Sequence, residues 1–493
     1  MIKLEINWAV NFLVAIIFYI ITDFLSYYTL GALLSFVFFI GLLAVYCKNE
    51  VKGFHLLIYL LLLSPDHPRN LIEDLDLLKE AGDITYYSFI TTKFAGVSLS
   101  VWSILIVGAI AFLRKVVKGN FKLPKIIVNI ILIVLISLAL ALLSTFLDLT
   151  SRDVVDLKFM FSDFRIFLTL VLGVFIAVGY VGKNSAYVTD FMQLLVNISV
   201  IIGLKSIMFV ASDLILASPK LMLSTQPYIF IALVFSYLVL DVKYKYLLLP
   251  LAILASVKIS RGEIAYIMME ALLLIFVVAL LYKNSLKKVT KVYSKNALVG
   301  LIVVALPVSW MALYNEYLFN FLVYKFSFFT TEIWSGDVAF SASTRMYEFL
   351  NIVAFQMENF RALIIGRGLG GYFDFTFFPL GYELGLSDFS SKELELGVFF
   401  KPHFFINFVL LKFGLTGLLL YSGLCLSLAY QGYRLASKSD GVKKLFGVYA
   451  IFLCIYSFNM FWQPILMLIS AITLTFLFYE NITRRNFEKR LSD

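Results

Sequence analysis

The sequence has little charge for its length. Only 15% of its 493 residues are charged, whereas 61% are hydrophobic and the mean hydropathy is +0.91. A soluble domain averages about 45–50% apolar and about 25% charged residues, so the composition excludes a water-soluble globular protein. The three cysteines, Cys47, Cys425 and Cys454, lie in or at the ends of apolar runs without metal-binding spacing. We interpret them as small buried hydrophobic residues.

Several catalytic motifs are also missing. The sequence contains no HExxH, no phosphate-binding GxxxxGK[ST] loop, no GxSxG and no Cys/His cluster. Metal-assisted catalysis and ATP hydrolysis are thus left without a recognisable apparatus, and we expect neither a metal nor another cofactor. Of the three histidines, His55 lies in an apolar run and His67 in a Ser-Pro-Asp-His-Pro turn, so we interpret both as structural.

Long apolar runs make up most of the chain. We predict an all-α polytopic membrane protein with about 14 transmembrane helices, since a helix needs about 20 apolar residues to cross the bilayer. The candidate spans lie near residues 6–23, 26–46, 52–64, 95–114, 126–147, 163–180, 187–210, 222–240, 245–259, 262–282, 297–314, 404–433, 444–460 and 463–480. The alternating ten-residue pattern of an outer-membrane barrel is absent.

The net charge of +9 is concentrated in short joints between these runs. Strongly basic joints, such as 114–125 and 283–295, fall on one side if the N-terminus is cytoplasmic, as the positive-inside rule requires. We therefore predict a multi-pass membrane protein with both termini in the cytoplasm and no nucleic-acid partner; the resemblance described below implies a bacterial cytoplasmic membrane. Residues 1–314 and 403–480 form its spans, 315–402 an extracytoplasmic loop, and 481–493 a basic tail.

The long loop is rich in aromatic residues, so we expect it to bury a small core of its own. They include Tyr372, Phe373, Phe375, Phe377, Phe378 and Tyr382. Ser343 or Thr344 is a suitable cap for a helix that starts near Arg345. Met346, Phe349, Leu350, Val353 and Met357 would then share one face of that helix.

The end of this loop carries a candidate general base. His403 follows Lys401 and Pro402 where the chain re-enters the membrane, and Asn407 lies one helical turn further on. An imidazole at this position has a pKa range suited to proton transfer near neutral pH. The alternative is an interfacial histidine that only anchors a helix end.

Arginines in unusual places are the other candidates. Arg261 lies in a tight break between two apolar runs, and Arg165 in or near another run, where a cation is costly. Arg345 presents a planar fork that suits phosphate, or it forms an ion pair with Glu348 three residues later. Arg367 stands within the glycine run between Gly366 and Gly371.

The glycine run has two interpretations. Gly366, Gly368 and their neighbours could form a nest of backbone N–H groups that binds an anion, or they could form a tight turn. A dinucleotide-binding fingerprint is excluded, because no strand of a βαβ unit precedes these residues.

Taken in order, three segments resemble the bacterial O-antigen polymerase and O-antigen ligase family of membrane glycosyltransferases. They are Ser260-Arg261-Gly262, then Ser343-Thr344-Arg345 leading into 365–373, then 403–408 followed by 413–419. The similarity covers chiefly residues 245–430. In the family an asparagine often follows the histidine directly, whereas Phe404 has that place here and Asn407 comes later.

This resemblance implies a GT-C-like fold and an inverting, metal-independent transferase facing the periplasm. The donor and acceptor would be oligosaccharides on undecaprenyl pyrophosphate, and a chain-length-regulating co-polymerase is a candidate partner. His403, Arg261 and Arg345 would be catalytic, and Arg367, Lys401, Asn407, Arg165, Gly366 and Gly368 would bind substrate. A polymerase is our first hypothesis and a ligase, which transfers the glycan to lipid A-core, is the second. A flippase or other transporter is the alternative from another class, and the intramembrane Asp190 and Lys205 are compatible with it.

Overall fold

The computed structural model is predominantly helical. It describes residues 6–21, 25, 28–64, 87–117, 124–149, 154–216, 340–380, 389, 391–460 and 464–492. Within these residues, seven helices are long and apolar enough to cross a membrane. Helices lie at ten of the predicted spans, while the four between 222 and 314 fall outside the described residues. In the part that the structure describes, the chain is thus a mostly helical membrane-type protein with one short two-stranded sheet.

The chain divides into two units. The first draws on Met1–Ile110, Val178–Phe326 and Gln431–Phe452, and the second on Ala111–Ala177, Ser327–Tyr430 and Leu453–Asp493. The described elements are α1 (Trp8–Tyr19), α2 (Thr29–Lys48), α3 (Glu50–Leu63), β1 (Lys93–Phe94), β2 (Val97–Ser98), α5 (Leu99–Val117), α6 (Lys125–Asp148), α7 (Leu157–Val181), α8 (Tyr187–Leu216), α15 (Phe340–Glu358), α16 (Phe360–Ile365), α17 (Ser391–Leu396), α18 (Phe405–Lys438), α19 (Gly441–Met460) and α20 (Pro464–Ser492).

In the first unit, α1 and α3 pack on α8, and α2 pairs with α3. Polar side chains join these helices. Asn11 donates to Asn197 at 3.3 Å, and His55 Nε2 lies 2.9 Å from the Tyr180 hydroxyl. Asp190 accepts a hydrogen bond from Asn184 at 2.6 Å. Buried polar groups of apolar helices gain from such mutual pairing, so these residues have a structural explanation, as expected for His55.

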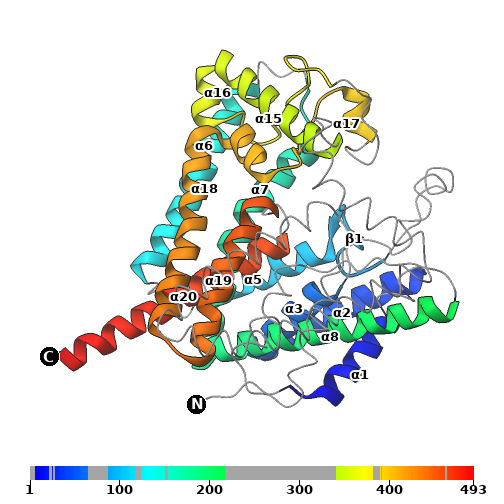
Figure 1. The fold of residues 1–493 in the computed structure, drawn as a ribbon, viewed down its shortest axis with the longest axis vertical. Helices are drawn as coiled ribbons and strands as arrows, with labels where there is room; N and C mark the ends of the chain where they lie inside the picture. The colour runs from blue at the N-terminus through cyan, green and yellow to red at the C-terminus, as the bar shows by residue number, and fades with distance from the viewer. Residues whose placement is uncertain are drawn as a thin grey trace, which may run out of the picture. The chain divides into compact units, whose positions relative to one another are not determined.

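The second unit contains long apolar helices with shorter ones at one end. Figure 1 shows α15, α16 and α17 gathered at one end of α6, α7 and α18. The aromatic loop does bury a core there, in which Phe373, Phe389 and Phe399 pack against Ile352 of α15 and Leu411 of α18. Phe377 and Phe378 are exposed instead.

The start of α15 differs from the prediction. The helix begins at Phe340, so Ser343 and Thr344 lie inside it and the predicted cap is wrong. The apolar face that the spacing predicted is real, but Met346, Phe349 and Met357 point away from the protein and are exposed.

The basic tail continues a span. α20 runs from Pro464 to Ser492 as one helix, so residues 481–492 extend it rather than forming a separate segment.

Candidate functional site

A histidine–glutamate pair lies where α15 meets the start of α18. The Glu348 carboxylate accepts a hydrogen bond from the His403 backbone N–H at 3.0 Å and lies 2.5 Å from His403 Nδ1. Glu348 is fully buried, whereas 26% of the His403 side chain is exposed. The imidazole is thus fixed on its buried side and open on the other.

This pairing bears on the chemistry of the imidazole. An ionised carboxylate only accepts hydrogen bonds, so a neutral His403 beside it would carry its hydrogen on Nδ1 and leave the lone pair of Nε2 free to accept a proton. The Phe389 ring stands edge-on to the imidazole, with 4.9 Å between centroids, and limits its rotation. This geometry would suit a general base.

Arg345 lies one helical turn before Glu348 on α15, beside the same segment. Its guanidinium carbon lies 5.2 Å from the centroid of the Phe404 ring. Its Nε is buried and has no hydrogen-bond partner among the described residues. Since Glu348 is engaged by His403, the local Arg345–Glu348 ion pair that the spacing allowed does not form. Leaving a buried donor without a partner costs free energy. The Nε of Arg345 is therefore available to donate to a bound acceptor.

Asn407 supports this arrangement from α18. It is buried, and its amide donates to the Arg345 backbone carbonyl at 3.3 Å. The structure thus places Asn407 where it positions α15. Substrate binding by Asn407 stays a prediction.

The glycine run is bound on both sides by other parts of the second unit. The N–H groups of Arg367 and Gly368 donate to the carbonyls of Leu411 and Lys412, each at 2.8 Å. The N–H groups of Leu369 and Gly370 donate to Thr145 and Asp163. These donors are therefore already used inside the protein. The contacts favour the tight-turn interpretation over an anion-binding nest for Gly366 and Gly368.

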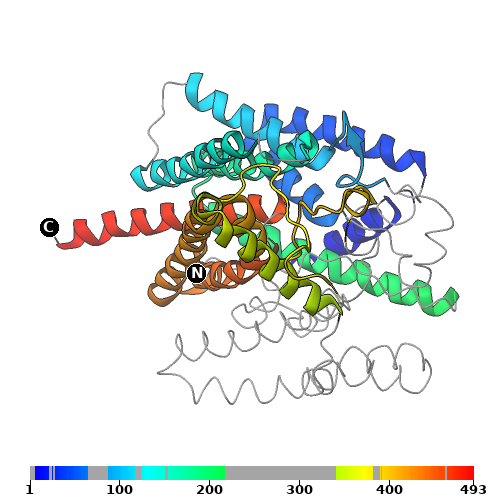
Figure 2. The same ribbon diagram turned by 90° about the horizontal axis from the view of Figure 1, so that it is seen from above.

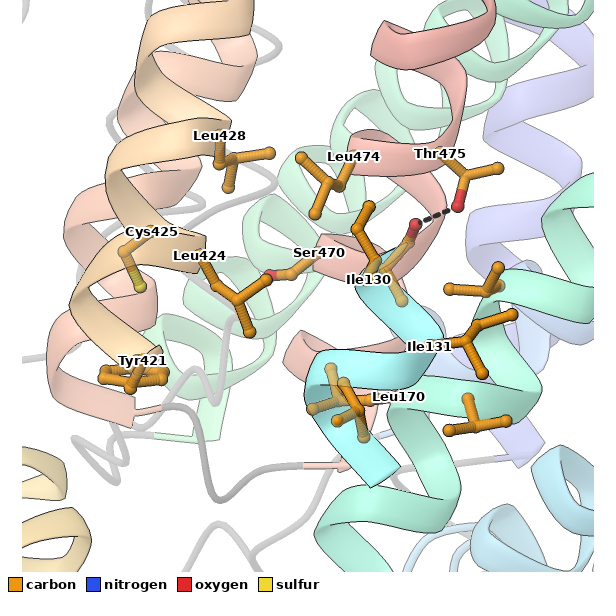
Figure 3. A pocket seen from close by; sticks show the side chains of 14 residues that line it. Ile130, Ile131, Leu170, Tyr421, Leu424, Cys425, Leu428, Ser470, Leu474 and Thr475 are labelled. Atoms are coloured by element: carbon orange, nitrogen blue, oxygen red, sulfur yellow. Dashed lines mark hydrogen bonds between the residues drawn. The ribbon is translucent and has the colours of Figure 1, made fainter. Parts of the chain in front are cut away.

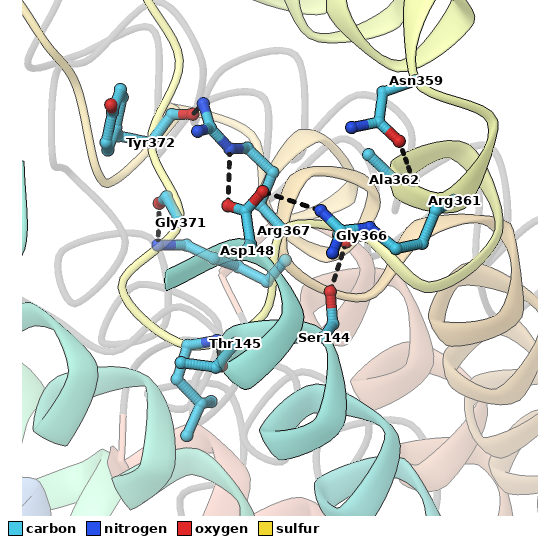
Figure 4. A network of polar contacts seen from close by, with 12 residues as sticks. Ser144, Thr145, Asp148, Asn359, Arg361, Ala362, Gly366, Arg367, Gly371 and Tyr372 are labelled. Carbon is cyan, nitrogen blue, oxygen red and sulfur yellow. Dashed lines mark hydrogen bonds and ion pairs between the residues drawn. The ribbon is translucent and has the colours of Figure 1, made fainter. Parts of the chain in front are cut away.

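Two arginines anchor the same region to the end of α6. One carboxylate oxygen of Asp148 forms an ion pair with Arg361 at 2.9 Å, and the other forms an ion pair with Arg367 at 3.2 Å. Arg367 also donates to the Tyr372 carbonyl at 2.9 Å. Figure 4 shows this network, with Ser144 of α6 bonded to the Gly366 carbonyl. Arg367 is thus buried in a network with Asp148 and Arg361, which we call the anchor. This geometry does not favour its predicted role in substrate binding.

A break in α18 leaves backbone carbonyls free to accept hydrogen bonds from the glycine run. Gly414 has non-helical angles, φ 60° and ψ −159°, within α18. The break frees the preceding carbonyls for the N–H groups of Arg367 and Gly368. The backbones are so close that a Cβ on Gly366 would lie 2.2 Å from the Lys412 carbonyl carbon, and one on Gly414 2.6 Å from the Gly366 nitrogen.

A buried ion pair completes the anchor. Lys412 of α18 lies 2.9 Å from Asp163 of α7 and also donates to the Gly371 carbonyl. Both side chains are almost fully buried. Within apolar helices a charge persists when it is paired in this way. Lys412 is an isolated charge in an apolar run, whereas Asp163 is followed two residues later by Arg165.

Replacing Gly414 with alanine should destabilise the protein without touching the histidine pair. The positive φ alone costs about 1–3 kcal/mol for a residue with a Cβ, and the contact with Gly366 adds to this cost. We expect a lower apparent melting temperature in detergent, measured by fluorescence-detected size-exclusion chromatography. Gly423→Ala in the same helix is the control, because nothing lies within 4 Å of its Cβ. Equal stability of the two variants would contradict the proposed anchor.

Two further cations lie near the pair. Lys401 precedes His403 by two residues, and its ammonium lies 5.8 Å from the centroid of the Phe159 ring. Although its side chain reaches solvent, loss of hydration and then the positive charge of Arg165 lower the pKa of Lys401. Among the described residues neither Lys401 nor Arg165 forms a salt bridge. An anion bound here would relieve the repulsion between them.

The start of α7 is fixed nearby. Asp156 accepts hydrogen bonds from the N–H groups of Lys158 and Phe159 and forms an ion pair with Lys392 of α17. Burial alone would raise the pKa of Asp156, but the hydrogen bonds from Lys392 and these N–H groups lower it. The carboxylate therefore stays ionised and holds α17 against α7.

The structure thus brings His403, Arg345, Asn407 and Lys401 into one region of the second unit. Arg261 lies outside the described residues. Sequence reasoning missed the pairing of Glu348 with His403 and the anchoring roles of Asp148, Asp163 and Lys412. Within the described ranges no group of three or more His, Cys, Asp or Glu residues is arranged to hold a metal ion.

An apolar cavity of about 40 Å³ lies apart from these groups, between α6, α7, α18 and α20. Leu170, Leu424 and Leu474 line it, as Figure 3 shows. Of its hydroxyl groups, that of Thr475 is used within its own helix, on the Ala471 carbonyl. The cavity is lined mainly by hydrocarbon and suits small apolar groups.

No protein-family model, curated protein or solved structure matches this chain. The function must therefore be argued from the residues and their geometry.

Proposed function

We propose that this chain is a membrane glycosyltransferase of the O-antigen polymerase type. The observation that carries the proposal is the His403–Glu348 pair beside Arg345, whose buried Nε has no partner within the described structure. A base and an adjacent unpaired cation are what glycosyl transfer from a pyrophosphate carrier needs. The remaining features of the prediction, about 14 spans, a GT-C-like fold, cytoplasmic termini and a periplasmic site, belong to the same proposal.

In the proposed reaction a sugar hydroxyl of the acceptor attacks the anomeric carbon of the donor. Nε2 of His403 takes the hydroxyl proton as the new C–O bond forms. The bond from the anomeric carbon to the pyrophosphate oxygen breaks on the opposite side, so the configuration inverts. Undecaprenyl pyrophosphate leaves with the bonding electrons.

Cationic side chains would stabilise that leaving group. The position of Arg345 next to the histidine segment supports this role, and Lys401 and Arg165 would add positive charge nearby. Arginine binds phosphate oxygens through a planar set of donors. Arg261 is proposed to act with Arg345 on the sequence resemblance alone.

The apolar surroundings support a lipid-borne substrate. α6 and α7, which contact this region through Asp148 and Phe159, are long and apolar enough to span hydrocarbon. A soluble donor such as a nucleotide sugar would need no such setting. The transporter alternative is less well supported, because Asp190 has a structural partner in Asn184.

A deletion strain tests the proposal through the banding of its surface polysaccharide on a gel. Loss of a polymerase leaves the core capped by a single repeat unit, and a plasmid copy of this chain should restore the ladder. Naked core with polymer retained on its carrier would instead identify a ligase. Accumulation of single lipid-linked units on the cytoplasmic side would identify a flippase and overturn the proposal.

A further inference from the structure

α15 buries several polar side chains and exposes several apolar ones. Its inward side carries Glu348, Asn351 and Gln356, all nearly fully buried, beside the buried apolar Ile352. Its outward side is largely apolar, with Met346 and Met357 61% and 74% exposed, and carries the exposed Glu358 at its end. In water such a helix would turn its apolar side inward. The arrangement therefore indicates that the outer side faces a non-aqueous environment.

The exposed apolar surface continues into α16. Phe349 of α15 and Phe360 and Ile364 of α16 are also exposed. Together with Met346 and Met357 they form what we call the outer apolar face. Exposed apolar surface of this extent on one side of two consecutive helices marks a contact with lipid or with another protein.

The neighbouring end of α6 decides between these two. α16 packs against α6, and Arg361 of α16 is paired with Asp148 at the last residue of α6. The segment Ile127–Asp148 has a mean hydropathy of 2.9 and is only 28% buried, as expected for a span that faces lipid. At its last turns Leu143, Phe146 and Leu147 are exposed.

The geometry of α6 sets the depth of this end. Its apolar segment of 22 residues, Ile127–Asp148, spans about 33 Å at 1.5 Å per residue, which matches the hydrocarbon thickness of about 30 Å. Asp148 therefore lies at the boundary of the hydrocarbon, and α16, bonded to it, lies at the same level. In Figure 2, α18 is seen end-on, and α15, in yellow-green, runs across the line of view.

We propose that α15 and α16 form an interfacial element, with the outer apolar face immersed in one leaflet of the bilayer. The polar side of α15, which carries Arg345 and Glu348, is then held at the depth of lipid head groups. This inference concerns membrane contact and does not depend on the reaction proposed above.

Spin labels test the proposal in lipid nanodiscs. On a Cys47→Ser background, where the remaining Cys425 and Cys454 are buried, single variants Met357→Cys and Phe360→Cys are labelled with a nitroxide. Collisions with oxygen, which concentrates in lipid, are compared with collisions with a water-soluble nickel chelate. Phe146→Cys on α6 is the lipid-facing control, and Glu395→Cys on α17, an exposed polar position, is the aqueous control.

We expect labels at 357 and 360 to resemble the label at 146, with high oxygen and low nickel accessibility. Nickel accessibility equal to that at 395 would overturn the proposal, because the face would then lie in water. Low accessibility to both reagents would also overturn it, since the face would be covered by protein. Met346→Cys and Phe349→Cys on the same face replace any variant that does not elute as a single species.

Discussion

A His403→Ala variant should lose polymer formation while it still folds. A positioned general base contributes about 10²–10⁴-fold to a rate, and we expect a loss in this range for the transfer step. The imidazole is partly exposed, and its removal leaves Glu348 to be solvated from the space that opens. The measurement is the rate of chain extension by purified protein in vesicles supplied with lipid-linked repeat units.

Glu348→Gln separates positioning from catalysis in the same assay. The amide keeps the size of the side chain, but it can donate to Nδ1 and so favour the tautomer with its hydrogen on Nε2. The maximal rate should therefore fall with little change in the substrate concentration for half-maximal rate. His55→Gln is the matched control, because His55 bonds to Tyr180 in the first unit. Normal extension rates in both His403→Ala and Glu348→Gln would exclude the pair from the mechanism.

The helices could be predicted from the sequence because the information for them is local, and seven of those described are long and apolar enough to cross a membrane. Ten candidate runs correspond to helices in the described residues. A long apolar run predicts a helix because, in lipid, a helix satisfies the hydrogen bonds of its own backbone. The start of α15 could not be placed as well. Ser343 and Thr344 resemble caps, but the preceding residues continue the helix from Phe340.

Several candidate residues were identified from the sequence, but only some of the contacts between them were predicted. His403, Arg345 and Asn407 were all identified from the sequence, and the structure brings them together. Glu348 had been considered as a local partner of Arg345, because three residues is a favourable helical spacing. Its actual partner lies 55 residues away, and a single sequence contains no signal for such a pairing.

The glycine run shows the same limit. Its backbone donors could have served an anion or a turn, and only the positions of Leu411, Lys412 and Thr145 decide between them. Those partners lie on α18 and α6, far away in the chain. The isolated charge of Lys412 was the available clue, because an unpaired charge in an apolar run requires a counter-charge.

Arg345→Ala should reduce the transfer rate by about 10²–10³-fold, the usual cost of removing one group that stabilises developing charge. Its effect on stability should be small. The Nε of Arg345 has no partner among the described residues, so truncation removes an unsatisfied donor and breaks no ion pair. Arg345→Lys keeps the charge but loses the planar set of donors, and it should recover only part of the activity.

The opposite pattern is expected for the arginine of the anchor. Arg367→Ala leaves the almost fully buried Asp148 carboxylate with one of its two cations removed, which lowers the free energy of unfolding. Activity per correctly folded molecule should fall less than in Arg345→Ala. Measuring the extension rate and the apparent melting temperature of both variants therefore distinguishes a catalytic arginine from a structural one. If Arg345→Ala lowers the melting temperature as much as Arg367→Ala and leaves the rate of the folded fraction unchanged, Arg345 is structural and the leaving group must be stabilised elsewhere.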